Sequence, residues 1–305
     1  MKKQDLVSLS DLSPEQLRRI LVNAVELKKG VGQRLLEGKT LALLFQKPSL
    51  RTRVSFDVAM VQLGGHTIYL SPDEVGLSKR ESVSDVARVV SRYVDVIAAR
   101  TFAHEDVEEL ARYASVPVIN ALSDQEHPCQ ALADLLTVEE KTNGLEGRTI
   151  AYIGDGNNVA ASLALGAAMS GVEFRIASPE GYELAERVIG TVKRLAVEAQ
   201  TRFVMLRDPE EAVREADVVY TDVWTSMGQE DQRERRLKAF ASYQVTERLL
   251  AQAGPGAIFM HPLPAHHGEE VANGLLDHPA SVVFDQAENR LHAQKSLLVE
   301  LFREA

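Results

Sequence analysis

Cysteine is almost absent from this chain, which has one, Cys129, among 305 residues. A single thiol excludes an internal disulfide and a cysteine-rich metal site. Long apolar runs are missing too, and none approaches the roughly 20 residues that a membrane-spanning helix requires. Residues 1–5 are not followed by an apolar core of the signal-peptide type, so the sequence predicts a cytoplasmic protein without a membrane partner.

Basic residues are also in deficit. Lysine and arginine number 34 against 44 acidic residues, which gives a formal net charge of −10. This balance argues against nucleic acid as a partner. It does not argue against a small anion, because net charge is screened beyond about 8 Å at physiological salt. A single arginine about 4 Å from a phosphate contributes on the order of 4 kcal/mol at an effective dielectric of 20.

Segments with strand and helix patterns alternate along the whole chain, which predicts an α/β fold with parallel sheets. The length exceeds what one core usually supports, so we expect two domains. The polar run at residues 142–147 is the predicted boundary. Residues 71–81 read as an exposed loop, residues 282–284 as the last strand, and residues 289–303 as a closing helix.

One stretch combines a strand exit with a helix start. Residues 40–45 form an apolar run, and helical spacing begins after Pro48. The first helical turn offers unpaired N–H groups and the positive end of the helix dipole. With two arginines and two hydroxyls, residues 49–53 predict a phosphate cradle. The alternative is an ordinary capped surface helix with solvated arginines.

Every other unusual cluster also follows a predicted strand, where ligands bind in open parallel sheets. These clusters are Arg100, His127, residues 154–158, residues 222–227 and residues 261–264.

Arg100 aligns with the cradle as a second anion-binding group. His127 and Gln130 lie three residues apart at a helix start, so their side chains can face one spot. A neutral imidazole and an amide suit an uncharged carbonyl or amide group. A histidine before proline is otherwise a common structural turn residue.

Three further patterns concern binding of a dinucleotide, an ammonium group and a metal ion. Gly154 and Gly156 partly match a dinucleotide-binding turn, but Val159 stands at the third glycine position. Asp222 and Ser226 suit an ammonium group, with Asp222 capping its own turn as the alternative. We predict no metal site, because the adjacent residues at 266–270 project differently, and no cofactor.

Five motifs together resemble a known family, the ornithine carbamoyltransferases of the aspartate/ornithine carbamoyltransferase superfamily. Residues 47–53, KPSLRTR, resemble its Ser-Thr-Arg-Thr-Arg motif, and residues 127–130, HPCQ, resemble its His-Pro-x-Gln motif. Three further segments resemble motifs of the same family: DVWTSMG at 222–228, HPLP at 261–264 and ENRLH at 288–292.

The resemblance implies a two-domain α/β enzyme that assembles as a homotrimer or a multiple of trimers and acts in arginine metabolism. Residues 1–146, completed by a returning C-terminal helix at 287–305, would bind carbamoyl phosphate. Residues 147–286 would bind L-ornithine. The δ-amine of ornithine would attack the carbamoyl carbon and release phosphate, giving citrulline without a covalent enzyme intermediate.

The resemblance also implies roles for individual residues. The phosphate would meet Ser49, the Leu50 backbone, Arg51, Thr52 and Arg100. The carbamoyl group would meet Thr52, Arg100, His127, Gln130, the Leu263 backbone and Arg290. Of these, the catalytic set would be Arg100, His127, Gln130 and Arg290. Ornithine would meet Asn158, Asp222, Ser226, Met227, Pro262 and Leu263.

Three positions depart from the family pattern. Leu50 replaces a threonine, and Gly76 stands where a glutamine commonly reaches into a neighbouring subunit, a role that Lys79 or Arg80 would take over. Pro262 replaces the usual cysteine. Putrescine or an N-acylornithine is therefore the alternative amine, and a non-catalytic amino-acid-binding regulator is the alternative class of function.

Overall fold

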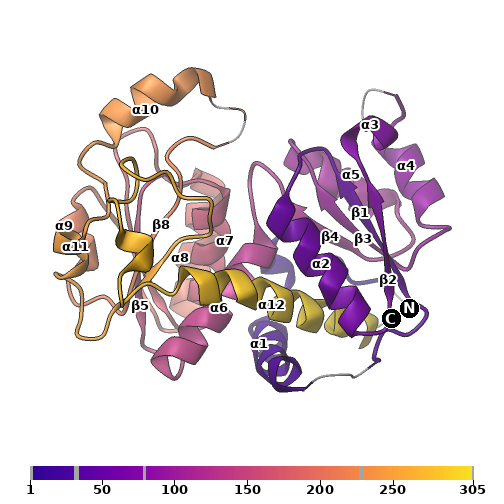
Figure 1. Cartoon of the computed structure of the whole chain (residues 1–305), viewed down its shortest axis with the longest axis horizontal. Coiled ribbons are helices and arrows are strands. Elements are labelled where there is room, and N and C mark those ends of the chain that lie inside the picture. The colour runs from indigo at the N-terminus through magenta and orange to yellow at the C-terminus, as the bar shows by residue number, and fades with distance from the viewer. Residues whose placement is uncertain (1–2, 31–33, 78–79, 227, 229, 304–305) are drawn as a thin grey trace. The chain divides into compact units, whose positions relative to one another are not determined.

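The computed structural model describes residues 3–30, 34–77, 80–226, 228 and 230–303. The chain divides into two compact units, Met1–Leu136 with Glu288–Ala305 and Thr137–Ala287 (Figure 1). The division falls inside a helix, a few residues before the boundary predicted at 142–147. Within the described ranges, no helix is long and apolar enough to cross a membrane.

The first unit is built on a four-stranded parallel sheet with the order β2-β1-β3-β4. Its strands are β1 (Thr40–Phe45), β2 (His66–Leu70), β3 (Val96–Arg100) and β4 (Val118–Leu122). Its helices are η1 (Leu9–Asp11), α1 (Pro14–Lys29), α2 (Leu50–Gln62), α3 (Pro72–Val75), α4 (Val83–Val90), α5 (His104–Tyr113) and the first part of α6 (Pro128–Thr142).

Both faces of this sheet are covered, as expected of a parallel sheet. On one face, Ala42 and Leu44 of β1 and Ile97 of β3 pack with residues of α4 and α5, among them Val86 and Leu110. Three of the four strands are fully or almost fully buried, whereas the residues of β2 alternate between exposed and half-buried positions at one edge. Because β1, β3 and β4 pair in parallel, their carboxyl ends lie at the same edge of the sheet.

The last helix, α12 (Val283–Arg303), begins in the second unit and ends in the first (Figure 1). The ammonium group of Lys295 donates to the Leu27 carbonyl of α1 at 2.9 Å and to the side chain of Gln62 of α2 at 3.1 Å. Ser296 donates to the Ile20 carbonyl of α1 at 2.7 Å. These contacts fasten the returning helix to the first unit, as predicted.

The second unit has a five-stranded parallel sheet with the order β7-β6-β5-β8-β9. Its strands are β5 (Thr149–Ile153), β6 (Glu173–Ala177), β7 (Phe203–Leu206), β8 (Val218–Thr221) and β9 (Ile258–Met260). Its helices are α7 (Asn158–Met169), α8 (Glu186–Glu198), α9 (Pro209–Val213), η2 (Glu230–Gln232), α10 (Arg233–Ala239), α11 (Glu247–Leu250) and η3 (Leu275–Asp277).

The predicted α/β fold of two parallel sheets flanked by helices is thus confirmed. Two local predictions are wrong. Residues 282–284 form no strand: Val282 donates one backbone hydrogen bond to Phe259, and α12 starts at the next residue. The loop at 71–81 contains α3, which begins because Ser71 and Glu74 form a capping box.

Candidate functional site

The predicted phosphate cradle lies at the start of α2, directly after β1. Ser49 is the N-cap of α2, and its hydroxyl accepts a hydrogen bond from the Thr52 amide at 3.3 Å. Leu50 is 76% exposed, so the departure from threonine falls on a position that faces solvent. Arg53 stacks its guanidinium 3.8 Å from the centre of the Tyr69 ring. Of the two arginines on this turn, Arg51 is therefore the one available for an anion.

Two further arginines, Arg51 and Arg290, lie close to Arg100, the last residue of β3. Burial lowers the pKa of Arg100 to about 10, and the positive charges of Arg290 and Arg51 act in the same direction. Burial also lowers the pKa of Arg51. Like charges held close together and partly desolvated destabilise one another. A bound anion with several oxygen acceptors relieves that repulsion, so the cluster is built for a phosphate-like group.

Arg290 connects this cluster to the motif at the start of α6. Its guanidinium donates to the amide oxygen of Gln130 at 2.8 Å and to the hydroxyl of Thr52 at 2.7 Å. The same group lies 3.5 Å from Nε2 of His127. Gln130 in turn donates to Asp134 at 2.8 Å, which fixes the orientation of its amide. The structure therefore brings together four side chains that the family resemblance assigned to the carbamoyl group, namely Thr52, His127, Gln130 and Arg290.

His127 is held in its neutral form. Its pKa lies well below the ordinary value of 6.5 because the ring is buried, and because Arg290 and Arg100 are nearby. Arginine can only donate, so Nε2 of His127 accepts from Arg290 and the proton of the neutral ring resides on Nδ1. Such an imidazole can orient a polar group without adding a further positive charge.

Lys47 is a further cation that the sequence analysis did not assign to the site. It is buried, and its ammonium lies 4.5 Å from the centre of the Phe102 ring. Burial and the charge of Arg100 lower the pKa of Lys47, while Asp124 raises it. Its position two residues before Ser49, at a strand exit, was the signal that could have identified it.

In the second unit, Asp222 follows β8 and is 7% exposed. Its carboxylate accepts from the side-chain amide of Asn157 at 2.8 Å and from the backbone amide of Val223 at 2.8 Å. Burial raises the pKa of Asp222, and the hydrogen bonds from Asn157 and Val223 act to lower it. Asp222 thus caps its own turn and is also a buried carboxylate, so the capping role leaves the ammonium-binding role as a prediction.

Of the other predicted amine-binding residues in this unit, the structure describes Asn158 and Ser226 but not Met227. Asn158 is the first residue of α7, and its neighbour Asn157, which the sequence analysis did not single out, both caps that helix and holds Asp222. Ser226 is half-buried. Met227 lies outside the described residues.

The segment after β9 is shaped by His261. Leu263 adopts a φ of +56°, in the left-handed region that residues other than glycine rarely occupy. Its backbone amide donates to Nδ1 of His261 at 2.9 Å, and Nε2 of that ring lies 3.3 Å from Glu270. Pro262, which lies between His261 and Leu263 in the sequence, is buried. The His261–Glu270 pair therefore fixes the backbone that was predicted to meet substrate, and Glu270 is a second residue the sequence analysis did not assign.

The glycine turn after β5 serves chain packing. The Gly156 amide donates to the Tyr182 carbonyl at 2.8 Å. A Cβ atom at position 156 would come within 2.3 Å of the backbone of Glu183 and Leu184. Glycine is required here by this close approach, and the amide that a dinucleotide phosphate would use is already occupied.

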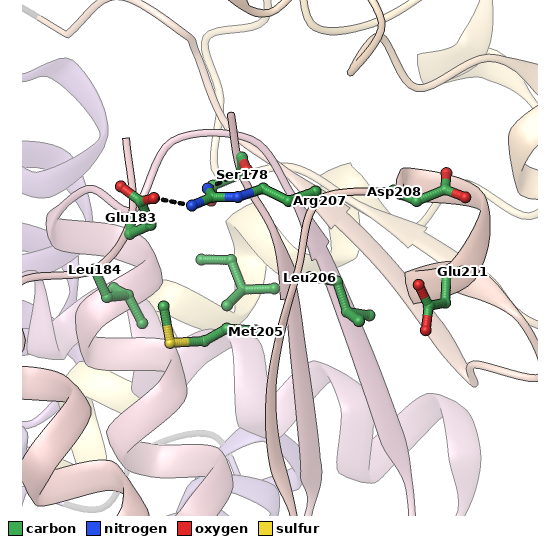
Figure 2. A pocket seen from close by; sticks show the side chains of 9 residues that line it. Ser178, Glu183, Leu184, Met205, Leu206, Arg207, Asp208 and Glu211 are labelled. Carbon is green, nitrogen blue, oxygen red and sulfur yellow. Dashed lines mark hydrogen bonds and ion pairs between the residues drawn. The ribbon is translucent and has the colours of Figure 1, made fainter. Parts of the chain in front are cut away.

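A pocket of about 370 Å³ lies at the ends of β6 and β7 (Figure 2). Leu184, Met205 and Leu206 contribute apolar surface, and Arg207 lies beside them, directed toward Glu183. Arg207 donates to the Ser178 carbonyl at 2.9 Å and also pairs with Glu183. This arginine therefore ties neighbouring segments of the unit together, and the pocket includes none of the predicted site residues.

Three possible metal ligands within residues 266–270 lie close together, whereas the sequence analysis expected the side chains of this segment to point in different directions. Ligand atoms of His266, Glu269 and Glu270 lie within 4.8 Å of one another. Glu269 pairs with Arg233, and Glu270 accepts from the His266 backbone and faces the His261 ring. The charges of this group can therefore be balanced by protein groups.

Comparison with known proteins agrees with this geometry. The model of the aspartate/ornithine carbamoyltransferase carbamoyl-P binding domain matches residues 4–140, and that of the Asp/Orn binding domain matches residues 146–301. The chain belongs to the aspartate/ornithine carbamoyltransferase family. The resemblance inferred from the five motifs is thereby confirmed.

Individual relatives are similar over almost their whole length. The ornithine carbamoyltransferase of Pyrococcus abyssi is 53% identical over 305 residues, which covers 99% of this chain and 96% of the relative. The ornithine carbamoyltransferase structure from Pyrococcus furiosus has a TM-score of 0.94 at 53% identity, covering 97% of this chain and 96% of that one. The anabolic enzyme structure from Campylobacter jejuni has a TM-score of 0.95 at 38% identity, covering 99% of this chain and 100% of that one.

Proposed function

We propose that this protein transfers the carbamoyl group of carbamoyl phosphate to the δ-amine of L-ornithine, giving L-citrulline and phosphate. The nitrogen–carbon bond forms as the bond between the carbamoyl carbon and the phosphate oxygen breaks, and the amine loses one proton. The observation that carries the proposal is the cluster of Arg51, Arg100 and Arg290 beside neutral His127 and Gln130. Cations suit the leaving phosphate, and neutral donors and acceptors suit the carbamoyl group.

The residue roles form part of the proposal. Phosphate binds at Ser49, the Leu50 backbone, Arg51, Thr52 and Arg100, where the start of α2 adds its dipole. The carbamoyl group binds at Thr52, Arg100, His127, Gln130, Arg290 and the Leu263 backbone. Catalysis consists of positioning and of stabilising the charge that develops on oxygen.

The amine is recognised by the second unit. The buried carboxylate of Asp222 needs a cation, which the α-ammonium group of ornithine supplies and an N-acylated ornithine lacks. Asn158, Ser226, Met227, Pro262 and Leu263 complete the proposed contacts. With Pro262 in place of a thiol, we propose that the amine proton leaves through the departing phosphate.

A steady-state assay with carbamoyl phosphate and a panel of amines tests the function. We expect turnover with ornithine to exceed that with putrescine, N-acetylornithine and aspartate. Preference for putrescine or N-acetylornithine would reassign the substrate. Binding of amino acids without any carbamoylated product would favour the regulator.

We further propose a homotrimer, or a multiple of trimers, in the cytoplasm. Leu50, Val54 and Val61 of α2 are 76%, 50% and 67% exposed, and such apolar groups favour burial in an interface. Light scattering should give at least three times the chain mass of 33.6 kDa. A mass equal to one chain would contradict the assembly.

Gly76 has a local reason to be glycine. It ends α3 in the left-handed region, with a φ of +53°, and a Cβ atom there would come within 2.8 Å of the Arg80 side chain. The hypothesis that Lys79 or Arg80 reaches a neighbouring site still stands for the exposed Arg80, while Lys79 lies outside the described residues. Unchanged affinity for carbamoyl phosphate in a Lys79→Ala, Arg80→Ala double variant would count against it.

A further inference from the structure

Arg236, on the short helix α10, is a buried cation inside the second unit, 6% exposed. Its guanidinium donates to the carboxylate of Asp155 at 2.8 Å and to the Trp224 carbonyl at 2.8 Å. It also lies 5.0 Å from the centre of the Tyr182 ring. One side chain thus joins the glycine turn after β5 to the loop after β8.

Both of these segments lead directly to the proposed amine-binding groups. Asp155 lies two residues before Asn157, whose side chain holds Asp222 at 2.8 Å. Trp224 lies two residues after Asp222 and two before Ser226, and its ring stacks on Phe240 with centres 5.6 Å apart. Arg236 therefore fixes the backbone on which Asp222 and Ser226 are mounted.

A buried ion pair adds little net stability, because desolvation offsets most of its attraction. The effect of this pair on charge is more specific. Asp155 is 8% exposed, and burial raises its pKa, while the charge and hydrogen bond of Arg236 act to lower it. Arg236 thus pairs with Asp155, one of the buried carboxylates near Asp222. Asp222 is held by the neutral donors of Asn157 and Val223 and has no arginine among these hydrogen-bond partners, so a cationic ligand would supply its charge partner.

We propose that Arg236 is a positioning and specificity-determining residue, which presents Asp222 as the one carboxylate for the α-ammonium group of the amine substrate. This inference rests on the proposed function. Putrescine lacks a carboxylate and carries one more positive charge than ornithine, so the charge balance at Asp155 and Arg236 should decide between the two amines.

The test uses two opposite changes in the full-length enzyme. Arg236→Met leaves Asp155 unpaired, and the added negative charge should favour putrescine. Asp155→Asn leaves Arg236 unpaired, and the added positive charge should disfavour putrescine. The measured quantity is the inhibition constant of putrescine divided by the KM for ornithine. It should fall in the first variant and rise in the second.

The KM values supply a second readout. Arg236→Met should raise the KM for ornithine about tenfold or more, because charged hydrogen bonds to Asp155 and Trp224 are lost. The KM for carbamoyl phosphate should stay within about twofold, because these bonds lie entirely within the second unit. Arg236→Lys should recover most of the loss. If Arg236→Met does not unfold cooperatively, Arg236→Lys and Asp155→Asn carry the test, since both keep a polar partner.

Arg148 is the matched control. It pairs with Asp217 at 3.0 Å and donates to the Thr142 carbonyl at 2.5 Å, at the opposite ends of β5 and β8. Arg148→Met should cost stability without changing either amine constant. Two outcomes would overturn this inference and leave the proposed function standing. One is a putrescine-to-ornithine ratio that moves in the same direction in Arg236→Met and Asp155→Asn. The other is a KM change for ornithine in Arg148→Met as large as that in Arg236→Met. Wild-type enzyme that neither binds nor carbamoylates ornithine overturns the proposed function and this inference together.

Discussion

Arg290 donates a hydrogen bond to the amide oxygen of Gln130 at 2.8 Å, although 160 residues separate the two in the sequence. The pair joins α12, which returns from the second unit, to the first turn of α6. Because the same guanidinium reaches Thr52 at 2.7 Å, one side chain of α12 orients groups from two other helices, α2 and α6, around the proposed carbamoyl position. A change at Arg290 should therefore affect chemistry more than folding.

Replacing Arg290 by methionine keeps a long side chain and removes every donor. We expect turnover to fall by about 10²- to 10³-fold, the usual cost of losing one oxyanion donor. Circular dichroism should remain that of the folded protein. Arg303→Met, on the exposed end of the same helix, is the control and should keep full activity. Turnover within about threefold of wild type in Arg290→Met would contradict the role assigned to it.

The arginine cluster predicts that phosphate stabilises the protein. An anion that binds the folded state at 100 times its Kd adds about 2.7 kcal/mol to the free energy of unfolding. Thermal unfolding should therefore shift upward in phosphate relative to chloride at equal ionic strength. Arg51→Gln should weaken the shift, whereas Arg53→Gln should not, because Arg53 is stacked on Tyr69. Equal shifts in the two variants would show that phosphate acts elsewhere.

The neutral state of His127 predicts a pH dependence of stability. Its pKa in the folded protein is lowered by burial, Arg290 and Arg100, whereas in the unfolded chain it is about 6.5. As pH falls below about 6.5, the unfolded state takes up a proton that the folded state refuses, so stability is lost at up to about 1.4 kcal/mol per pH unit. His127→Gln removes this contribution.

Denaturant unfolding at several pH values between 7.5 and 5.5 measures this effect. The advantage of wild type over His127→Gln in free energy of unfolding should shrink toward low pH. The exposed His267 provides a matched control through His267→Gln. A difference that stays constant across this range would contradict a buried, neutral His127.

Asp222 should cost the isolated protein stability while serving substrate binding. Burial raises its pKa, so the folded state binds the proton more tightly than the unfolded state does. The resulting penalty is absent below the unfolded pKa and grows as pH rises toward the folded pKa. Asp222→Asn should therefore unfold no more easily than wild type at pH 7.

The same variant should lose its affinity for ornithine. We expect the KM for ornithine to rise at least about 30-fold, since a charged partner for the α-ammonium group is removed. Asp217→Asn, at the other end of β8 beside Arg148, is the control. A lower melting temperature with unchanged KM would mean that Asp222 only caps its own turn.

Much of the fold could be predicted from the sequence because its signals are local. The apolar run of β1, the helix start at residues 49–53 and the helical spacing of α2 lie within about two dozen residues of one another, and the structure confirms all three. The errors were local as well. Val282 and Val283 have strand-like side chains, but a single hydrogen bond to Phe259 is the only ladder-type bond that this segment makes among the described residues before α12 begins.

The site was predicted only in part. Motif order placed Arg100, His127, Gln130 and Arg290 in one family pattern, without showing how they meet. Asn157 and Glu270 were missed because each acts through a contact that sequence spacing does not reveal. Lys47 was missed although its place at a strand exit could have identified it. Arg236 was missed for the same reason, since 81 residues separate it from Asp155.

The sequence by itself determined the alternation of strands and helices, the order of the motifs and the family, because patterning and backbone preferences act between near neighbours. Tertiary structure alone decided which charges would be desolvated together. The low pKa of His127, the crowding of Arg51, Arg100 and Arg290, and the pairing of Arg236 with Asp155 all depend on burial and on distances between remote segments. Electrostatic energies follow those distances, so the protonation states that the chemistry requires appear only once the chain has folded.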